Sequence, residues 1–314
     1  EDFYEEKDIK SKILSINKIK NYTSLKVKDQ YENNPYPRWV TTRINKTPLS
    51  LESLIRDLRL DIIDDLPQSF LKPLILVAGC GTGQHSIGVA NRIENSKIEA
   101  IDLSFSSLSY SIRKTKELEI KNIKYFQADI LELAEFKNKY DIIESVGVLH
   151  HMENPMEGWK TLVKCLRPKG LMKIGLYSKF AREKISFFKK NFVNKELLGT
   201  KSEIIEYRKK ILQSNNPELF NISQSSDFYT TSSFRDLLLH TQEHQFTLIH
   251  IKKSLFDLGL KFCGFEIADK NIIKEFEKIY PEREDFYNLE IWHNFEKENK
   301  DIFSGMYQFW VQKL

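Results

Sequence analysis

Three glycines stand close together at the end of a short apolar run. The sequence reads Ile75-Leu76-Val77-Ala78-Gly79-Cys80-Gly81-Thr82-Gly83. A turn of this kind between a strand and a helix exposes backbone N–H groups and lets a ligand approach the main chain closely. The spacing G-x-G-x-G differs from the dinucleotide fingerprint G-x-G-x-x-G, whose third glycine would fall on Gln84. The loop alone therefore predicts some nucleotide cofactor and does not name it.

Two acidic residues follow the loop, each at the end of a predicted strand. Asp102 ends the run Ala100-Ile101-Asp102, and a carboxylate about 20 residues after such a loop accepts hydrogen bonds from ribose hydroxyls. Asp129 ends the run Gln127-Ala128-Asp129, from which a side chain can reach an adenine amino group. The series of glycine loop and acids predicts a nucleoside lying over the strand ends.

Short apolar runs that alternate with longer amphipathic stretches must position these residues. Five runs are predicted as strands: Leu74–Ala78, Ile98–Asp102, Ile123–Ala128, Tyr140–Val146 and Leu171–Tyr177. Strands that alternate with helices are typical of a parallel α/β sheet with right-handed crossovers. Their mostly apolar character indicates a sheet that helices cover on both faces.

The flanking segments have other patterns. Ile9, Ile13, Ile16 and Ile19 predict an amphipathic helix within residues 1–30. Further predictions are extended chain around 33–39, helices over 51–60 and 246–258, and strands over 260–267 and 306–311. We divide the chain into an N-terminal helical and lid segment (1–70), a cofactor-binding core (71–177), a helical cap on the substrate side (178–245) and a C-terminal completion of the sheet (246–314).

The composition is that of an ordinary globular protein. Hydrophobic residues make up 41% and charged residues 29%, which argues against disorder. The 48 basic and 44 acidic residues are interspersed, so nothing demands a nucleic-acid partner. No apolar run approaches the roughly 20 residues of a membrane helix, and the acidic start is unlike a signal peptide. The 3 cysteines lack CxxC spacing, which favours buried thiols in a reducing, cytoplasmic compartment.

Taken in order, the motifs resemble those of the class I S-adenosylmethionine (SAM)-dependent methyltransferases. They read GCGTG, IDLS, QADI, YDIIESVGVLHH and LRPKG. The resemblance implies a Rossmann-like α/β fold: a seven-stranded sheet in the order 3-2-1-4-5-7-6, its last strand antiparallel, with helices on both faces and a helical cap insertion. It also implies SAM as the cofactor and S-adenosylhomocysteine (AdoHcy) as the product.

The resemblance further implies which residues contact the cofactor. The glycine loop would approach the methionine part, Asp102 the ribose, and Asp129 with Ile130 the adenine. Many relatives carry an acid two residues before the first glycine, where this chain has Val77, so the amino group of the methionine part needs another partner, such as the carbonyls of Ala78 or Gly147. The full expected set is Tyr31, Arg38, Trp39, Gly79, Cys80, Gly81, Gly83, Asp102, Leu103, Asp129, Ile130, Glu144 and Gly147.

Three further stretches, NPYPRW, GLYSKFAR and DFYTTSSFRDLLLHTQEHQFTL, resemble one bacterial subfamily whose members often follow tetratricopeptide repeats. This implies residues before Glu1 and an upstream repeat module in the natural protein. Tyr31, Tyr36, Arg38 and Trp39 allow two interpretations. They form a lid over the methionine end of the cofactor, with Arg38 suited to a carboxylate, or a structural strap with Trp39 packed into the core. We expect the lid.

Six residues are candidates for the acceptor side of the site: His150, His151, Tyr177, His240, Glu243 and His244. The paired histidines follow the fourth strand, so one is a candidate acid or base, and packing against the next helix is the alternative. The last three form H-x-x-E-H, a spacing of some zinc peptidases, and on a helix its two histidines share a face. We favour a pocket or structural role for this motif and expect no metal.

These observations predict a SAM-dependent methyltransferase. Because the sulfonium is already activated, the protein mainly orients the substrate and excludes water, and no nucleophilic side chain or metal is required. A small-molecule acceptor is expected, because the cap could enclose a pocket. A protein methyltransferase and a non-catalytic SAM-binding regulatory module are the alternatives.

Overall fold

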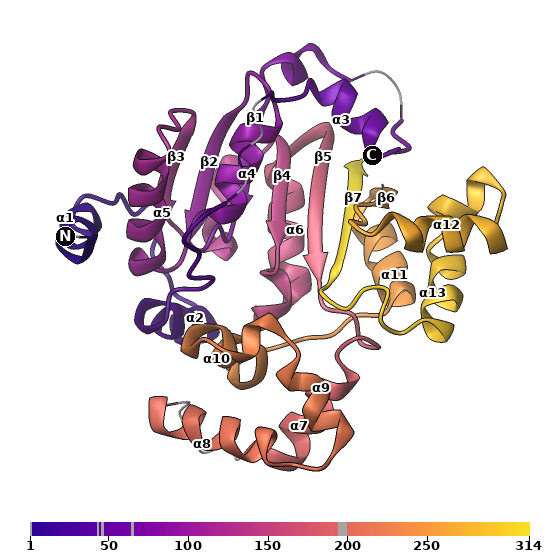
Figure 1. The fold of residues 1–314 in the computed structure, drawn as a ribbon. Coiled ribbons are helices and arrows are strands. Elements are labelled where there is room, and N and C mark those ends of the chain that lie inside the picture. The colour runs from indigo at the N-terminus through magenta and orange to yellow at the C-terminus, as the bar shows by residue number, and fades with distance from the viewer. Residues whose placement is uncertain (1, 43, 45–46, 64–65, 194–199) are drawn as a thin grey trace.

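The computed structural model describes residues 2–42, 44, 47–63, 66–193 and 200–314. Its centre is a seven-stranded sheet in the order β3-β2-β1-β4-β5-β7-β6 (Figure 1). The strands are β1 (Leu74–Ala78), β2 (Lys97–Asp102), β3 (Ile123–Gln127), β4 (Tyr140–Val146), β5 (Leu166–Leu176), β6 (Leu260–Phe265) and β7 (Tyr307–Lys313). The predicted strand order is confirmed, and β7 is antiparallel to both of its neighbours.

Each face of the sheet has its own apolar core, because successive side chains of a strand point to opposite faces. In β1, Ile75 and Val77 belong to the core under α3 (Leu51–Asp57), α4 (Gln84–Arg92) and α5 (Phe105–Glu117). Leu76 and Ala78 belong to the core under α6 (Pro155–Cys165), α11 (Leu248–Leu258), α12 (Lys270–Ile279) and α13 (Leu289–Glu298). Burial on both faces explains why the strands read as nearly continuous apolar runs.

The N-terminal segment forms two helices, α1 (Asp2–Lys10) and α2 (Tyr22–Asn33), where one was predicted. The chain between them pairs with the edge strand β3. Ile16 N–H donates to the Gln127 carbonyl at 3.0 Å, and Gln127 N–H donates to the Leu14 carbonyl at 2.9 Å. These bonds satisfy backbone groups that an edge strand would otherwise leave open. The single-helix prediction is wrong because this backbone pairs with the sheet.

After β5 the chain builds a cap from α7 (Glu183–Phe192), α8 (Lys201–Leu212), α9 (Pro217–Ser223) and α10 (Thr231–Leu239). The cap buries a small apolar cluster of its own, which includes Phe188, Tyr207 and Phe234. In Figure 1, α10 lies next to α2 at the end of the sheet toward which β4 and β5 point. Ligands of open α/β sheets bind at this carboxyl edge.

The chain leaves the cap as an extended segment. His244 N–H donates to the His150 carbonyl at 2.7 Å, and Phe246 N–H donates to the Tyr177 carbonyl at 2.9 Å. Since this backbone pairs with the strand ends, α10 stops at Leu239. The helix assumed for the H-x-x-E-H motif is therefore wrong, and the one predicted over 246–258 begins only at Leu248.

No described helix is long and apolar enough to cross a membrane. The three cysteines, Cys80, Cys165 and Cys263, are buried and free, as expected.

A buried carboxylate fastens the start of the cap to the end of the sheet. Glu296 on α13 is fully buried and accepts hydrogen bonds from Ser178 Oγ at 2.5 Å and from Tyr307 Oη at 2.7 and 2.8 Å. Burial raises the pKa of Glu296 from 4.5 to about 7, although both hydroxyls favour the charged form. The folded protein therefore holds a proton here that the unfolded chain releases.

This proton makes stability depend on pH in a defined direction. Because the pKa of Glu296 is higher in the folded state, its contribution is full below pH 4.5 and is lost as the pH rises to about 7. The loss is at most about 1.4 kcal/mol per pH unit for one proton. We expect Glu296→Gln, which stays neutral, to flatten this part of the profile in urea unfolding between pH 5 and pH 8. Glu298→Gln, an exposed change on the same helix, is the control and should behave like the wild type. An unchanged profile in Glu296→Gln would contradict the assignment.

Candidate functional site

A cavity of about 260 Å³ lies at the carboxyl edge of the sheet, between the loops after β1 to β5 and the two covering helices α2 and α10. Many of the residues singled out from the sequence line it: Tyr31, Tyr36, Gly79, Cys80, Gly81, Asp102, Leu103, Asp129, Ile130, Gly147, His151 and Tyr177. The rest of those residues lie outside the lining: Arg38, Trp39, Gly83, Glu144, His150, His240, Glu243 and His244.

The glycine loop has a shape that only glycine permits. Gly79 has φ +78°, and a Cβ there would lie 2.4 Å from a methyl of Val148. Gly81 has φ +52°, and a Cβ there would lie 2.9 Å from the Tyr36 carbonyl oxygen. Side chains are strained at such φ values and would also fill the space beside the cavity. Because these positions have no side chains, backbone atoms form the cavity wall here.

Asp102 holds this loop from the end of β2. Its Oδ2 accepts from Gly81 N–H at 2.8 Å and its Oδ1 accepts from Ser104 N–H at 2.9 Å. Burial raises the pKa of Asp102 to about 6, and the two backbone N–H groups partly offset this. Each carboxylate oxygen can accept a second hydrogen bond. Asp102 can therefore organise the loop and still bind hydroxyl groups in the cavity.

Asp129 has a carboxylate oxygen without a well-formed hydrogen bond among the residues that the structure describes. Its Oδ1 accepts from Leu131 N–H at 3.0 Å, while its buried Oδ2 lacks a well-formed hydrogen bond among the described residues. Burial raises the pKa of Asp129, and the backbone N–H of Leu131 and the Ser24 hydroxyl oppose this. Buried polar atoms usually have a partner, so such an acceptor at a cavity wall fits a donor on a ligand.

Glu144 is engaged within the protein. It lies opposite Val77 on the neighbouring strand and is fully buried, with Arg92 at 2.6 Å and His85 Nε2 at 2.9 Å. Arg92 holds the pKa of this carboxyl well below its usual range, despite burial that would raise it. Direct contact between Glu144 and a cavity ligand, as predicted, does not fit this placement, whereas His85 does line the cavity.

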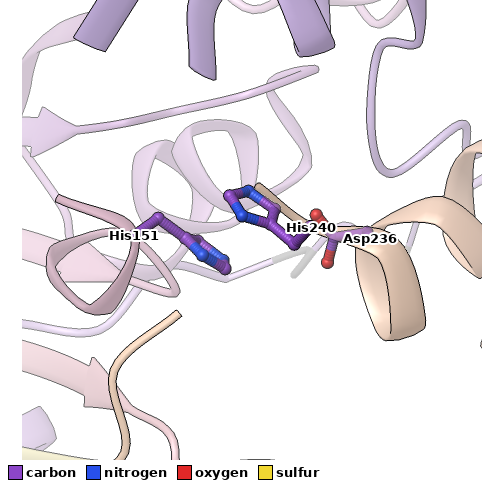
Figure 2. Close-up of side chains that lie close together, drawn as sticks. All are labelled: His151, Asp236 and His240. Carbon is purple, nitrogen blue, oxygen red and sulfur yellow. The ribbon is translucent and has the colours of Figure 1, made fainter. Parts of the chain in front are cut away.

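At one end of the cavity, titratable groups of the cap meet Tyr31 of α2 and residues that follow β4 and β5. Tyr31 Oη donates to Asp236 Oδ1 at 2.6 Å and lies 3.1 Å from His240 Nε2. The imidazole rings of His240 and His151 stack with centroids 3.6 Å apart. Figure 2 shows these two rings side by side, with the Asp236 carboxylate close to His240. Tyr177 completes this end and carries the Arg182 guanidinium 4.0 Å from its ring centroid.

Several residues with predicted roles at the cofactor have side chains outside the cavity lining. Trp39 is buried in an apolar cluster, where its Nε1–H donates to the Thr82 carbonyl, and this placement favours the strap interpretation. The Arg38 side chain is exposed and outside the cavity lining. Glu243 is bound to Arg182 at 2.6 Å and to Lys189 at 2.9 Å, which lower its pKa to about 2. A buried ion pair of this kind is a structural part of the cap.

The remaining histidines and Gly83 also lie behind the lining. His150 is fully buried and stacks on Tyr177 at 3.9 Å, and burial lowers its pKa. His244 contacts the side chain of Gln242 at 2.9 Å. Gly83 is the N-cap residue of α4 at φ +87°, where a Cβ would lie 2.8 Å from Ser111. These residues support the cavity wall.

Asp236 is the main site residue that the sequence did not reveal. In the stretch Ser232-Ser233-Phe234-Arg235-Asp236 it resembles an ordinary solvated helix residue. Its spacing of four from His240 was the available signal, because residues that far apart share a helix face.

Comparison with known proteins agrees with this architecture. Residues 75–170 match the family described as a methyltransferase domain. An uncharacterized protein of Synechococcus is 27% identical over 63% of this chain and 50% of its own length. A ubiquinone biosynthesis O-methyltransferase of Rickettsia bellii is 28% identical over 50% of this chain and 61% of its own length. The chain thus spans only about half to three fifths of these relatives.

Among solved structures, PKMT2 from Rickettsia typhi is similar in fold. The TM-score is 0.58 at 16% sequence identity, over 87% of this chain and 54% of that one. Its complex with AdoHcy gives a TM-score of 0.55 at 17% identity, over 88% of this chain and 54% of that one. Residues 75–170 are thus similar to a methyltransferase domain, and the whole sheet is similar in fold to PKMT2.

Proposed function

We propose that this chain binds SAM in the cavity and transfers its methyl group to a small-molecule acceptor. The observation that carries the proposal is Asp129 Oδ2, which lacks a well-formed hydrogen bond among the described residues although Asp129 lines the same wall as Asp102 and the glycine loop. An adenine amino group supplies the donor that Asp129 lacks, ribose hydroxyls fit Asp102, and backbone at Gly79 and Gly81 suits the methionine part. The match to a methyltransferase domain supports the same cofactor.

The acceptor would enter at the end of the cavity that carries His151, Tyr177 and Asp236. There its lone pair attacks the methyl carbon in line with the sulfonium. The new bond forms as the carbon–sulfur bond breaks, and that electron pair stays on sulfur. A proton released by the acceptor passes to a neighbouring base or to water. The protein's part is to orient the two reactants and to exclude water.

A small acceptor is favoured because the cavity is covered from two sides. The Tyr31–Asp236 hydrogen bond joins α2 to α10, and Thr241 N–H donates to Gln30 Oε1 at 3.3 Å. A protein side chain would need these contacts to open before it reached the methyl group. The name of the Rickettsia bellii relative, an O-methyltransferase, supports an oxygen acceptor. The cytoplasmic location and the upstream tetratricopeptide module stay predictions.

The adenine contact is tested by Asp129→Asn. The variant keeps an oxygen for Leu131 N–H but presents an amide donor where the adenine amino group needs an acceptor. Losing one hydrogen bond to a charged group costs about 1.5–3 kcal/mol, so we expect SAM affinity in isothermal titration calorimetry to fall at least about tenfold. Asp269→Asn is the control, because this exposed Asp caps α12 in the same way. Wild-type SAM affinity in Asp129→Asn would contradict the assignment of Asp129 to the adenine contact.

The ribose contact is tested separately by Asp102→Ala. This change removes both the acceptor for the hydroxyls and the two bonds that hold Gly81 and Ser104. We expect SAM affinity to fall by at least about tenfold. If affinity stays at the wild-type value while the fold is intact by circular dichroism, Asp102 does not bind the cofactor.

The acceptor class is tested with SAM that carries a labelled methyl group. The protein is incubated with the low-molecular-weight fraction and, separately, with the protein fraction of a bacterial extract. We expect label and AdoHcy to appear with the first fraction. Label in the protein fraction alone would establish the protein-methyltransferase alternative. SAM binding without turnover in either fraction would favour the regulatory module.

A further inference from the structure

Three buried side chains at the acceptor end of the cavity form a cluster of residues that commonly bind metal ions. His151, Asp236 and His240 each offer one ligand atom, and these atoms all lie within 4.8 Å of one another. His151 follows β4, whereas Asp236 and His240 come from α10 and its end. Figure 2 shows the three side chains converging from these two parts of the chain. The cluster joins the sheet to the cap next to the place proposed for the acceptor.

The carboxylate in this cluster has no cation in direct contact among the residues that the structure describes. Asp236 is 5% exposed and forms no ion pair with any residue that the structure describes, its one hydrogen bond there coming from Tyr31 Oη. The nearby guanidinium of Arg182 is already bound to Glu243. A buried carboxylate is costly unless it is paired or coordinates a metal. Arg182 acts on Asp236 only without direct contact, so the carboxylate can still bind a cation.

The two imidazoles are suited to supply the other ligands. His151 Nδ1–H donates to the Gln242 carbonyl at 2.7 Å, which leaves the lone pair on Nε2. A backbone carbonyl on the second ring nitrogen is the usual support of a metal-bound histidine. Both rings are buried, and a histidine binds a metal through its neutral imidazole.

We propose that His151, Asp236 and His240 bind one divalent transition-metal ion of the Zn²⁺ type at the acceptor end of the cavity. Two imidazoles and one carboxylate are a ligand set of Zn²⁺ and other first-row metals, and three protein ligands leave a position open for a substrate. The next step rests on the proposed function. The open position would hold the acceptor's oxygen and favour the deprotonated form of that oxygen.

Metal binding changes two local contacts. Gln242 N–H donates to His240 Nδ1 at 3.2 Å, which places the ring proton on Nε2, toward Tyr31. Coordination through Nε2 requires the other tautomer, so this long bond is given up. The contact of His240 Nε2 with Tyr31 Oη is also given up, whereas Tyr31 keeps its hydrogen bond to Asp236 Oδ1 when the ion binds Oδ2. The hydrogen-bonded link between α2 and the cap is thus retained.

The test titrates metal-free protein with ZnCl₂ by calorimetry and with CoCl₂ by visible absorption. We expect one saturable site. Co²⁺ bound there should show the visible absorption bands of an ion in a low-symmetry coordination site. Asp236→Asn and His240→Gln should each weaken binding at least about tenfold, since even residues that only support metal ligands change affinity by 10–100-fold. His250→Gln is the control, because this histidine is exposed and outside the cluster.

Two results would overturn the proposal: no saturable binding by the wild type, or wild-type affinity in both ligand variants. Thermal unfolding shows whether the variants are folded. His240 does not line the cavity, so His240→Gln should keep AdoHcy affinity while it loses the metal. Loss of metal binding with AdoHcy binding retained supports the metal site. Failure of AdoHcy binding in the wild type with a saturable metal site refutes the proposed cofactor instead.

Discussion

The reversal of strand order at β1 and β4 is the constraint on which the rest of the structure depends. β1 pairs in parallel with β2 on one side and with β4 on the other. The helix after β1 belongs to one face of the sheet and the helix after β4 to the other, as the two cores show. The loops that follow the two strands must separate, and a crevice opens between them. The glycine loop and the segment Gly147–His151 form its walls.

The cover of this crevice comes from parts of the chain that are far apart in sequence. α2 and α10 meet through the Tyr31–Asp236 hydrogen bond, and Glu296 ties the beginning of the cap to α13 and β7. These links are few and polar, whereas the two faces of the sheet are held by extensive apolar packing. The described links between the cover and the rest of the protein thus include titratable groups, and Tyr31 and Asp236 lie at the acceptor end of the cavity.

The sheet and the cavity wall that contains Asp102 and Asp129 were largely predictable from the sequence, whereas the cover formed by α2 and α10 was not. Apolar runs and the ordered motifs specify the strands, because buried parallel strands leave a continuous apolar signal. Asp102 and Asp129 were visible for the same reason, since each ends such a run. The sequence could not place Trp39, because an aromatic residue looks the same in the sequence whether it packs in a core or over a ligand. Asp236 was missed because its environment is created by Tyr31 and His240, which no local pattern brings together.

A crystal structure of the protein with AdoHcy tests the central claim most directly. The account predicts the adenine amino group within hydrogen-bond distance of Asp129 Oδ2 and the ribose hydroxyls on Asp102. It also predicts that the sulfur faces the end of the cavity that carries His151 and Asp236. AdoHcy bound elsewhere, or in this cavity with Asp129 Oδ2 still without a partner, would contradict it.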